Sequence, residues 1–513
     1  MASISTGIST GAKIAFAVGG AFVLAVCGVL FWLWGMNVIH WFTADFREFS
    51  AFWILTLAGL VVAGFLGFRA SVNSSRLQTG FAITALSLGL LAGLFVGTMV
   101  APYHMAKGYY EASTTTIANS VAPSYSERAP YDLAVRTSDK SLMNITGDSQ
   151  VTKSLADEGE SGEWNTLVVE RGVFKGYEAV QNMNLPLYGT SQNSNVKFCE
   201  FSETATLRDH GAMPHNNLSR AIFNKVPLNV GYEESDFYSY CNDANEPVVV
   251  VPLKQIDGFF FPTWKAYGVA VYNGQSGVLD VVTDAGKILE LPGPTYPASL
   301  AASQRNSLIA NGTWWEMVGE RVSGFVAASD NTEVNLRFAD NSDTEYVTSL
   351  MPRGSSTSIV AVSHVSASMK FPGAYNPLIV AAFSPENVRP ANSTLADDLK
   401  TRYSYMPDMA NDTIGIFEIT SGKDGGWIAS LGREQSVNYR AYISPAGDKI
   451  ELKDRNGTLI AQGSATGGTA ANGESNGEEP SVTLTPTGVS TLSNDELNTL
   501  GKAVMEELAK RAK

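Results

Sequence analysis

Three long apolar segments near the start of the chain dominate its hydrophobic pattern: Ile14–Met36, Ala51–Phe68 and Gly80–Ala101. At about 1.5 Å per residue, the first and third can cross a hydrocarbon core of about 30 Å, and the second only just can. The first segment is too long for the apolar part of a signal peptide, and it lacks a small-residue cleavage site. The pattern therefore predicts a three-span membrane anchor over residues 1–101.

The charges that flank these segments indicate how the anchor is oriented. Lys13 precedes the first segment, and Arg69 and Arg76 lie between the second and third. The loop between the first and second segments carries only Arg47, which stands between two acidic residues. Because cytoplasmic loops are enriched in Lys and Arg, we expect a cytoplasmic N-terminus and an extracytoplasmic chain from about residue 102 onward.

Small residues recur at every fourth position of the apolar segments, which predicts helix-packing faces. The members in the second and third segments are Gly59, Ala63, Gly67, Gly89, Gly93 and Gly97. Such stripes let two helix backbones approach closely in a membrane. They leave open whether the bundle closes within one chain or between chains. The expected partners are therefore membrane lipid and other membrane proteins, in a homo- or hetero-oligomer.

After residue 130 the pattern changes to short apolar runs between turn residues, which predicts strands. The strongest signal is Tyr267–Leu291, which we interpret as a three-stranded meander with Asn-Gly and Asp-Ala-Gly turns. A helix is expected from Pro297 onward. The predicted fold class is α+β: the anchor, a juxtamembrane connector over 102–130, and a large β-rich extracytoplasmic domain over 131–462. That domain is either one unit or two subdomains that meet near 245–265.

The end of the chain combines a linker with a helix. Residues 463–492 are rich in Gly, Ser, Thr and Ala and contain no cation, a composition typical of a disordered linker. Residues 493–513 begin with a capping box, Ser493 followed by Glu496, which predicts an amphipathic helix. Its apolar stripe consists of Leu497, Leu500, Val504 and Leu508. The stripe is either the contact face for a partner or part of an unpaired tail.

The overall charge excludes one class of function. The chain carries a net charge of −14 over 513 residues. Nucleic-acid binding depends on Lys and Arg that neutralise phosphates, and no basic patch interrupts the acidic composition. We therefore expect no nucleic-acid partner and interpret the acidity as a device for solubility.

Candidate chemistry is sparse. Cys199 and Cys241 both follow the last span, so they form either one disulfide or two buried thiols. Asp209, His210 and His215 are weak candidates for a metal site, because Pro214 breaks any helix that would align them. The alternative there is an ordinary polar loop. The common catalytic and nucleotide-binding motifs are absent, so we assign no catalytic residue and expect no cofactor.

A dense aromatic turn lies between two of the predicted strands. Residues 257–264 read Asp-Gly-Phe-Phe-Phe-Pro-Thr-Trp. We interpret this turn as core between subdomains, and an exposed patch for a partner is the alternative.

Four stretches of the outer domain resemble uncharacterised integral membrane proteins of actinobacteria and their phages. The stretches are VKFCEF, GPTYPASLAASQR, YVTSLMPRGSSTSIVAVS and GWIASLGREQSVNYRA. The resemblance covers most of residues 80–462 and implies a bacterial inner membrane, with no particular reaction.

These observations favour a non-enzymatic envelope protein whose outer domain binds or scaffolds partners in a larger membrane assembly. The small-residue stripes and the amphipathic tail indicate packing against other chains, and no motif indicates catalysis. The alternatives are a membrane-anchored enzyme that acts on envelope polymers or lipids, and an accessory subunit of a transporter or channel.

Overall fold

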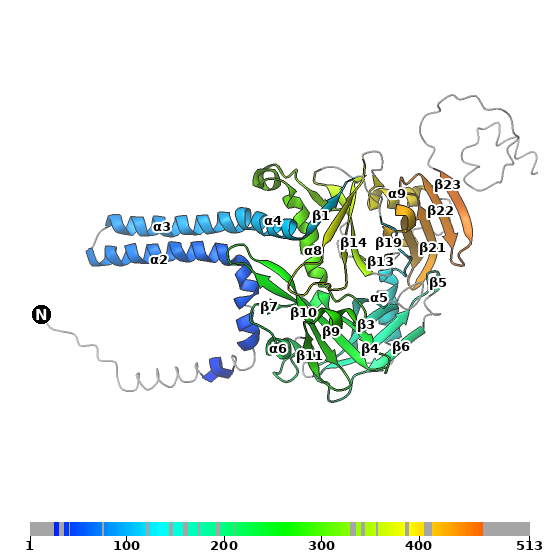
Figure 1. The fold of residues 1–513 in the computed structure, drawn as a ribbon, viewed down its shortest axis with the longest axis horizontal. Helices are drawn as coiled ribbons and strands as arrows, with labels where there is room; N and C mark the ends of the chain where they lie inside the picture. The colour runs from blue at the N-terminus through cyan, green and yellow to red at the C-terminus, as the bar shows by residue number, and fades with distance from the viewer. Residues whose placement is uncertain are drawn as a thin grey trace, which may run out of the picture.

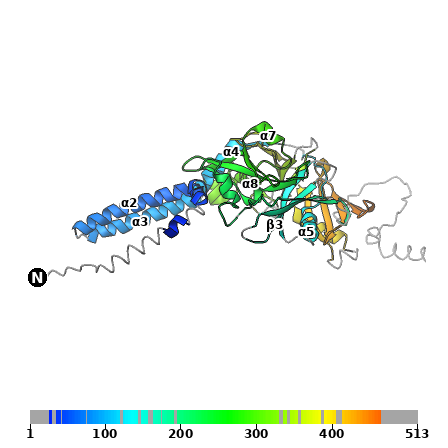
Figure 2. The same cartoon turned by 90° about the horizontal axis from the view of Figure 1, so that it is seen from below.

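A computed structural model shows a pair of long helices that projects from a large β-rich body (Figures 1 and 2). The helical pair consists of α2 (Ser50–Asn73) and α3 (Arg76–Phe95), and the body runs from β1 (Thr114–Ile117) to β23 (Leu459–Ser464). The coarse expectation of mixed helix and sheet with a β-rich body is confirmed. The structure describes residues 25–29, 35–40, 42–73, 76–118, 123–142, 147–156, 163–172, 175–190, 195–209, 211–328, 335–339, 344–354, 358–384, 389–404 and 413–464.

Several expectations concern residues outside these described ranges. Of the first apolar segment, only residues 25–29 and its last two residues are described, and they are helical. Most of the linker, the C-terminal helix and its Leu497, Leu500, Val504 and Leu508 stripe lie outside the described residues. The three-helix anchor and the C-terminal helix therefore stay predictions.

The helices α2 and α3 cross most closely where glycine faces glycine. A Cβ atom on Gly89 would lie 2.5 Å from the Cα of Gly59, and one on Gly93 would lie 2.5 Å from the hydroxyl oxygen of Thr56. A Cβ on Gly97 would lie 3.0 Å from the nearest side chain of α2. Because Cβ atoms do not approach backbone this closely, glycine is what allows the contact. The small-residue stripe of α3 thus packs within one chain.

The other small residues of α2 are less tightly enclosed. A Cβ on Gly67 would lie 3.9 Å from the side chain of Ala82, which is an ordinary contact, and Ala63 is partly exposed. The outer faces of the pair carry exposed side chains such as Val61 and Leu91. Two helical stretches, 46–69 and 81–113, are long and apolar enough to cross a membrane.

The helical stretch 81–113 continues beyond its apolar part. A π-helical turn (η2, Val96–Val100) joins α3 to α4 (Ala101–Ser113), so one helix runs from the pair into the body. Pro102 has no N–H to donate, and the wider turn that precedes it accommodates this loss. The connector that we expect from residue 102 therefore begins as a docked helix, and Lys107 and Glu111 form an i,i+4 ion pair on it.

Four main sheets and one short strand pair build the body. One six-stranded sheet has the order β1–β17–β16–β14–β12, with β13 on β14, and a five-stranded sheet has the order β11–β10–β9–β7, with β8 on β9. A four-stranded sheet, β2–β3–β4–β6, and a second six-stranded sheet, β19 to β23 with β5, complete it. The bounds of these strands are β2 Gly147–Ala156, β3 Glu163–Glu170, β4 Tyr177–Asn184, β5 Gly189–Thr190, β6 Asn195–Glu200, β7 Val230–Gly231, β8 Tyr238–Cys241, β9 Pro247–Asp257, β10 Thr263–Asn273, β11 Leu279–Val282, β12 Phe325–Ala327, β13 Asn335–Phe338, β14 Thr344–Pro352, β16 Ala361–Ser366, β17 Leu378–Ala382, β19 Gly415–Ser421, β20 Trp427–Arg433, β21 Ser436–Ile443 and β22 Lys449–Asp454. The short pair joins β15 (Ser358–Ile359) to β18 (Arg389–Pro390).

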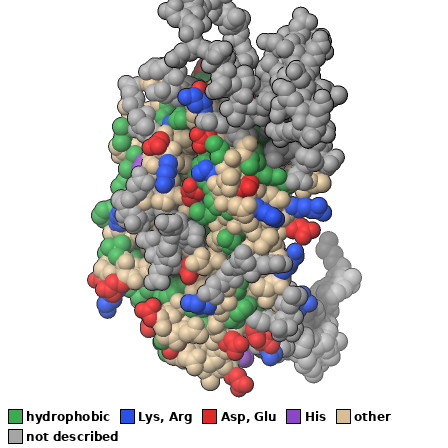
Figure 3. Space-filling view, turned by 90° about the vertical axis from the view of Figure 1, so that its right-hand side faces the viewer, with side chains coloured by type: hydrophobic (Ala, Val, Ile, Leu, Met, Phe, Trp, Pro, Cys, Tyr) green, Lys and Arg blue, Asp and Glu red, His purple; other side chains and the backbone are tan. Residues whose placement is uncertain are grey.

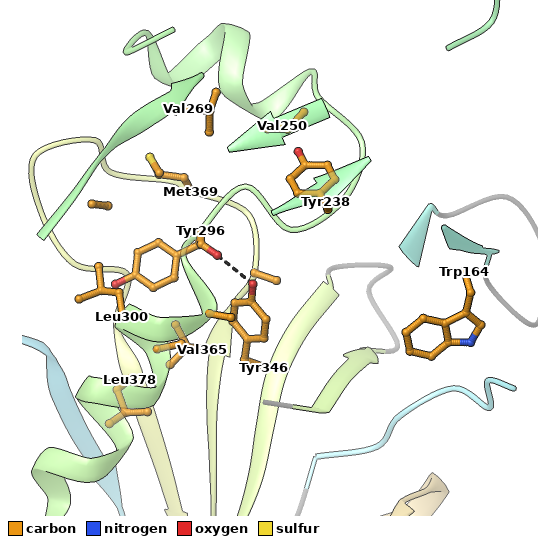
Figure 4. Packing of buried hydrophobic residues seen from close by; sticks show 14 of the residues in the cluster. Trp164, Tyr238, Val250, Val269, Tyr296, Leu300, Tyr346, Val365, Met369 and Leu378 are labelled. Atoms are coloured by element: carbon orange, nitrogen blue, oxygen red, sulfur yellow. Dashed lines mark hydrogen bonds between the residues drawn. The ribbon is translucent and has the colours of Figure 1, made fainter. Parts of the chain in front are cut away.

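Short helices cover and connect the sheets. They are α5 (Tyr131–Ser141), α6 (Leu218–Phe223), η4 (Glu234–Asp236), α7 (Ala285–Leu289), α8 (Ala298–Asn306), η5 (Ser307–Asn311), η6 (Trp315–Glu320), α9 (Asn392–Arg402) and η8 (Lys423–Gly425). A further short helix, η1 (Asp45–Phe49), directly precedes α2. Helix α8 lies between two sheets and contributes Leu300 to the largest buried cluster (Figure 4). In that cluster the hydroxyl of Tyr346 on β14 donates a 2.8 Å hydrogen bond to the carbonyl of Tyr296, just before α8. The cluster therefore joins the two sheets through α8.

Two of the sequence-based expectations concern residues 245–291. The third strand of the expected meander is wrong, because residues 285–289 form helix α7, capped by the side chain of Asp284, which accepts from the N–H of Lys287. An N-cap residue with a following helical turn competes successfully with the apolar alternation of this short segment. The junction that we expect near 245–265 falls within β9 and β10, which pair along most of their length.

The structure joins Cys199 on β6 and Cys241 on β8 in a disulfide, with Cα atoms 6.0 Å apart. The bond closes a loop of 42 residues between two different sheets. Because it restricts the unfolded chain, such a bond stabilises a fold by about 2–4 kcal/mol.

Removing this disulfide should lower the free energy of unfolding by that amount. The variant is the double change Cys199→Ala and Cys241→Ala, measured by urea denaturation of the detergent-solubilised protein. Cys27→Ser is the control, since this exposed cysteine is free and should leave the midpoint unchanged. An unaltered midpoint in the double variant would show that the bond does not form in solution.

Candidate functional site

The first candidate region is the junction between the start of α2 and the turn between β9 and β10. The guanidinium of Arg47 donates to the carbonyl of Gly258, and the hydroxyl of Ser50 donates to the carbonyl of Phe259. The indole N–H of Trp264 donates to the carboxylate of Glu48. Gly258 and Phe259 lie in the turn between β9 and β10, outside the strand ladder, so their carbonyls accept from side chains. The body is thereby held to α2.

The second part of the junction is α4, whose polar side chains bind the segment after α8. The hydroxyl of Tyr103 donates to the carbonyl of Gly312 at 3.2 Å, and the ammonium of Lys107 donates to the carbonyl of Ala310 at 3.3 Å. The hydroxyl of Tyr110 donates to the side-chain oxygen of Asn311 at 2.6 Å. These contacts satisfy carbonyls at the end of a helical segment, which would otherwise lack partners.

Aromatic contacts complete the junction on both sides of the helices. The indole N–H of Trp314 donates to the carbonyl of Met99 at 2.9 Å. The ring of His104 stacks on Phe261, with centroids 4.6 Å apart. The body therefore contacts η1 and the first residue of α2 on one side, and η2 and α4 on the other, so several bonds set its orientation relative to the helical pair.

The sequence interpretation missed this role of the 257–264 turn. Trp264 is buried, as expected for core, but Phe259 and Phe260 have exposed fractions of 61 and 54%. The interpretation as core is therefore wrong for these two side chains. The available signal was the position of consecutive phenylalanines between two strongly β-forming runs, since a hairpin turn lies on the surface.

The predicted metal candidates do not converge in the described part of the chain. The carboxylate of Asp209 accepts from the hydroxyls of Tyr232 at 2.8 Å and Ser219 at 3.2 Å, inside the body. His215 is exposed, and His210 lies outside the described residues. Among the residues that were placed, no group of three His, Cys, Asp or Glu could hold a metal ion. The metal site stays a prediction.

Asp236 is a second buried carboxylate, and its hydrogen bonds indicate a structural role. Asp236 accepts from the N–H of Ser299 at 2.7 Å and from its hydroxyl at 2.6 Å, which caps the first turn of α8. Burial raises the pKa of Asp236 to about 6, and the bonds from Ser299 and the charge of Lys254 offset only part of this rise. The two bonds from Ser299 give this buried carboxyl a structural role as a cap of α8.

The raised pKa predicts how stability depends on pH. Because the folded pKa lies above the usual value of 3.8, the folded state binds the proton more tightly than the unfolded state. Folding stability should then fall as pH rises from about 4 to about 7, by about 3 kcal/mol from this group. Chemical denaturation of the wild type and Asp236→Asn at both pH values isolates this contribution, since the asparagine does not titrate. Parallel pH profiles would contradict the assignment.

Ser363 and His364 are adjacent on β16, and their side chains contact different neighbours. The ring of His364 lies 3.1 Å from the carboxylate of Glu345, and Ser363 lines a cavity beside Arg305. That cavity has room for about one water molecule, which is too little for a substrate. Because successive side chains of a strand point to opposite faces, this placement does not pair Ser363 with His364 as a nucleophile and base.

No family model, curated protein or solved structure matches the chain. The resemblance to actinobacterial and phage membrane proteins therefore stays an expectation.

Proposed function

We propose that the protein is a membrane-anchored scaffold subunit. The helical pair spans a bilayer, and the body binds other copies or other subunits of a membrane assembly. The proposal rests on the double attachment of the body, through the bonds from Arg47 and Ser50 at the start of α2 and through the continuous helix formed by α3 and α4. A flexible linker would be enough to keep an enzyme near a membrane. Attachment to both helices instead sets one orientation for a binding surface.

We place the N-terminus in the cytoplasm of a bacterial inner membrane and the body on the extracytoplasmic side. The distribution of Lys and Arg around the apolar segments supports this orientation. The disulfide between Cys199 and Cys241 also supports it, because such bonds persist outside the reducing cytoplasm.

The test is purification in mild detergent followed by mass measurement of the intact particle. We expect other copies or other subunits to accompany the wild-type chain, and a clean monomer would overturn the proposal. A polytopic transporter in the particle would favour the accessory-subunit alternative, and turnover of envelope polymers or lipids by a lone chain would favour the enzyme.

A variant tests the importance of the double attachment. A Gly/Ser linker of about ten residues between Val100 and Ala101 uncouples α3 from α4 without changing any side chain. We expect the particle to lose its partners, whereas the same insertion after residue 470 should have no effect. Retention of all partners in the first variant would show that the continuous helix is not needed.

A further inference from the structure

Five large apolar side chains are exposed on segments of the body that contact the helical pair or the residues before it. We call them the apolar rim, and their exposed fractions lie between 48 and 61%: Leu228, Phe259, Phe260, Trp315 and Val322. They come from the loop before β7, from the turn between β9 and β10, and from η6 and the residues after it. Single exposed apolar side chains are common on protein surfaces. What distinguishes these five is that their segments lie beside the long helices.

The segments that carry the rim are bonded to the helices. The hydroxyl of Thr43 donates to the carbonyl of Leu228, and that of Ser50 donates to the carbonyl of Phe259. Trp314, whose indole binds the carbonyl of Met99, has its ring 6.1 Å from that of Trp315. The rim segments therefore lie where the two long helices meet the body.

The apolar parts of both helices end at the level of these contacts. The apolar part of α2 begins at Ala51, directly after Ser50, and that of the second helix ends at Ala101, two residues after Met99. From Phe81 to Ala101 the helix rises about 30 Å, which equals the thickness of a hydrocarbon core. If these helices span a bilayer, its body-side surface lies at Ser50 and Met99.

We propose that the apolar rim inserts into the interfacial layer of the bilayer that the helical pair spans, with lipid as its occupant. This rests on the proposed function, since it requires the pair to be in a membrane. Phenylalanine and tryptophan side chains partition readily to the level of lipid headgroups and upper acyl chains. The end of the body opposite the pair shows charged side chains of both signs among hydrophobic and other uncharged ones (Figure 3). The rim would hold the body down on the membrane.

The experiment measures the depth of spin labels in the full chain, reconstituted into phosphatidylcholine vesicles. Labels replace Phe260 and Trp315 in a Cys27→Ser background, in which the disulfide protects the other cysteines. Val278→Cys is the matched control. This side chain is 50% exposed in the loop after β10, next to Asn273, and β10 itself is about 33 Å long, so the label lies beyond the opposite end of that strand from Phe260. Val61→Cys reports on the middle of α2.

We expect the ratio of oxygen to nickel-complex accessibility to be several-fold higher at positions 260 and 315 than at 278. Water-like values at 260 and 315, together with lipid-like values at 61, would overturn the rim proposal and leave the anchor standing. Water-like values at 61 as well would overturn both. Shielding of 260 and 315 from oxygen and nickel alike would show that a protein, not lipid, covers the rim.

Discussion

Substituting leucine for Gly89 should separate α2 from α3. A Cβ atom at this position would lie 2.5 Å from the Cα of Gly59, and the obstructing atom belongs to backbone that cannot rotate away. The helices must then move apart along the stretch that includes Gly93 and Thr56, where contacts are equally close. Overpacking usually costs about 1–3 kcal/mol when side chains can adjust, and more is expected here. The predicted result is loss of the tight crossing.

The measurement is the distance between spin labels on α2 and α3 in detergent, together with the thermal midpoint of the particle. Gly64→Leu is the matched control, because a Cβ on Gly64 meets no atom within 4 Å. The control should leave both quantities unchanged. If Gly89→Leu also leaves them unchanged, the glycine stripe reflects only the composition of membrane helices. Gly93→Leu should behave like Gly89→Leu.

Replacing Arg440 with alanine should strongly destabilise the body. Its side chain is 1% exposed, and its guanidinium donates to the carboxylate of Glu127 at 2.6 Å and to the carbonyl of Arg128. Arg128 in turn binds Glu418 on β19 through two 3.1 Å bonds. Removing one partner of a buried pair costs about 3–5 kcal/mol, and we expect a value toward the lower end because the side chain of Glu127 is 22% exposed. The lost packing of a large side chain adds to this cost.

These two arginines attach residues 127 and 128, just before α5, to the C-terminal six-stranded sheet. Urea denaturation of Arg440→Ala should therefore show a large fall in the unfolding midpoint. Lys140→Ala is the control, since Lys140 and Glu434 form a 3.7 Å pair with side chains 56 and 68% exposed. Exposed pairs contribute little to stability. Equal midpoints for the two variants would mean that the buried pair is not formed.

Local sequence patterns predict some elements of this fold well and others poorly. The strand β10 and its turn to β11 carry alternating residues with Asn273-Gly274 in the loop, and both are found in the structure. The partner strand β9 has eight consecutive buried residues, from Pro247 to Lys254. A strand buried on both faces lacks the alternation that makes strands recognisable. The short helix α7 was mistaken for a strand because five residues hold too few turns to show a helical period.

The aromatic turn of residues 257–264 was also only partly predictable from the sequence. The sequence places three phenylalanines in a turn, but it cannot say whether another element covers them. Phe261 stacks on His104 of α4, whereas Phe259 and Phe260 extend outward, and only the docking of the long helices decides this difference. The closure of the glycine stripe within one chain is likewise a tertiary result, since a stripe packs equally well against a second copy.

By itself, the sequence determined the apolar helices, their small-residue faces and the β-rich character of the remainder. These features depend on residue type and period, which act over a few turns of helix or one strand. The tertiary structure decided how the body is attached: the helix that continues through Val96–Val100, the bonds from Arg47 and Ser50, and the rim beside them. These contacts join residues about two hundred positions apart, and no local pattern encodes which distant carbonyl a side chain will reach.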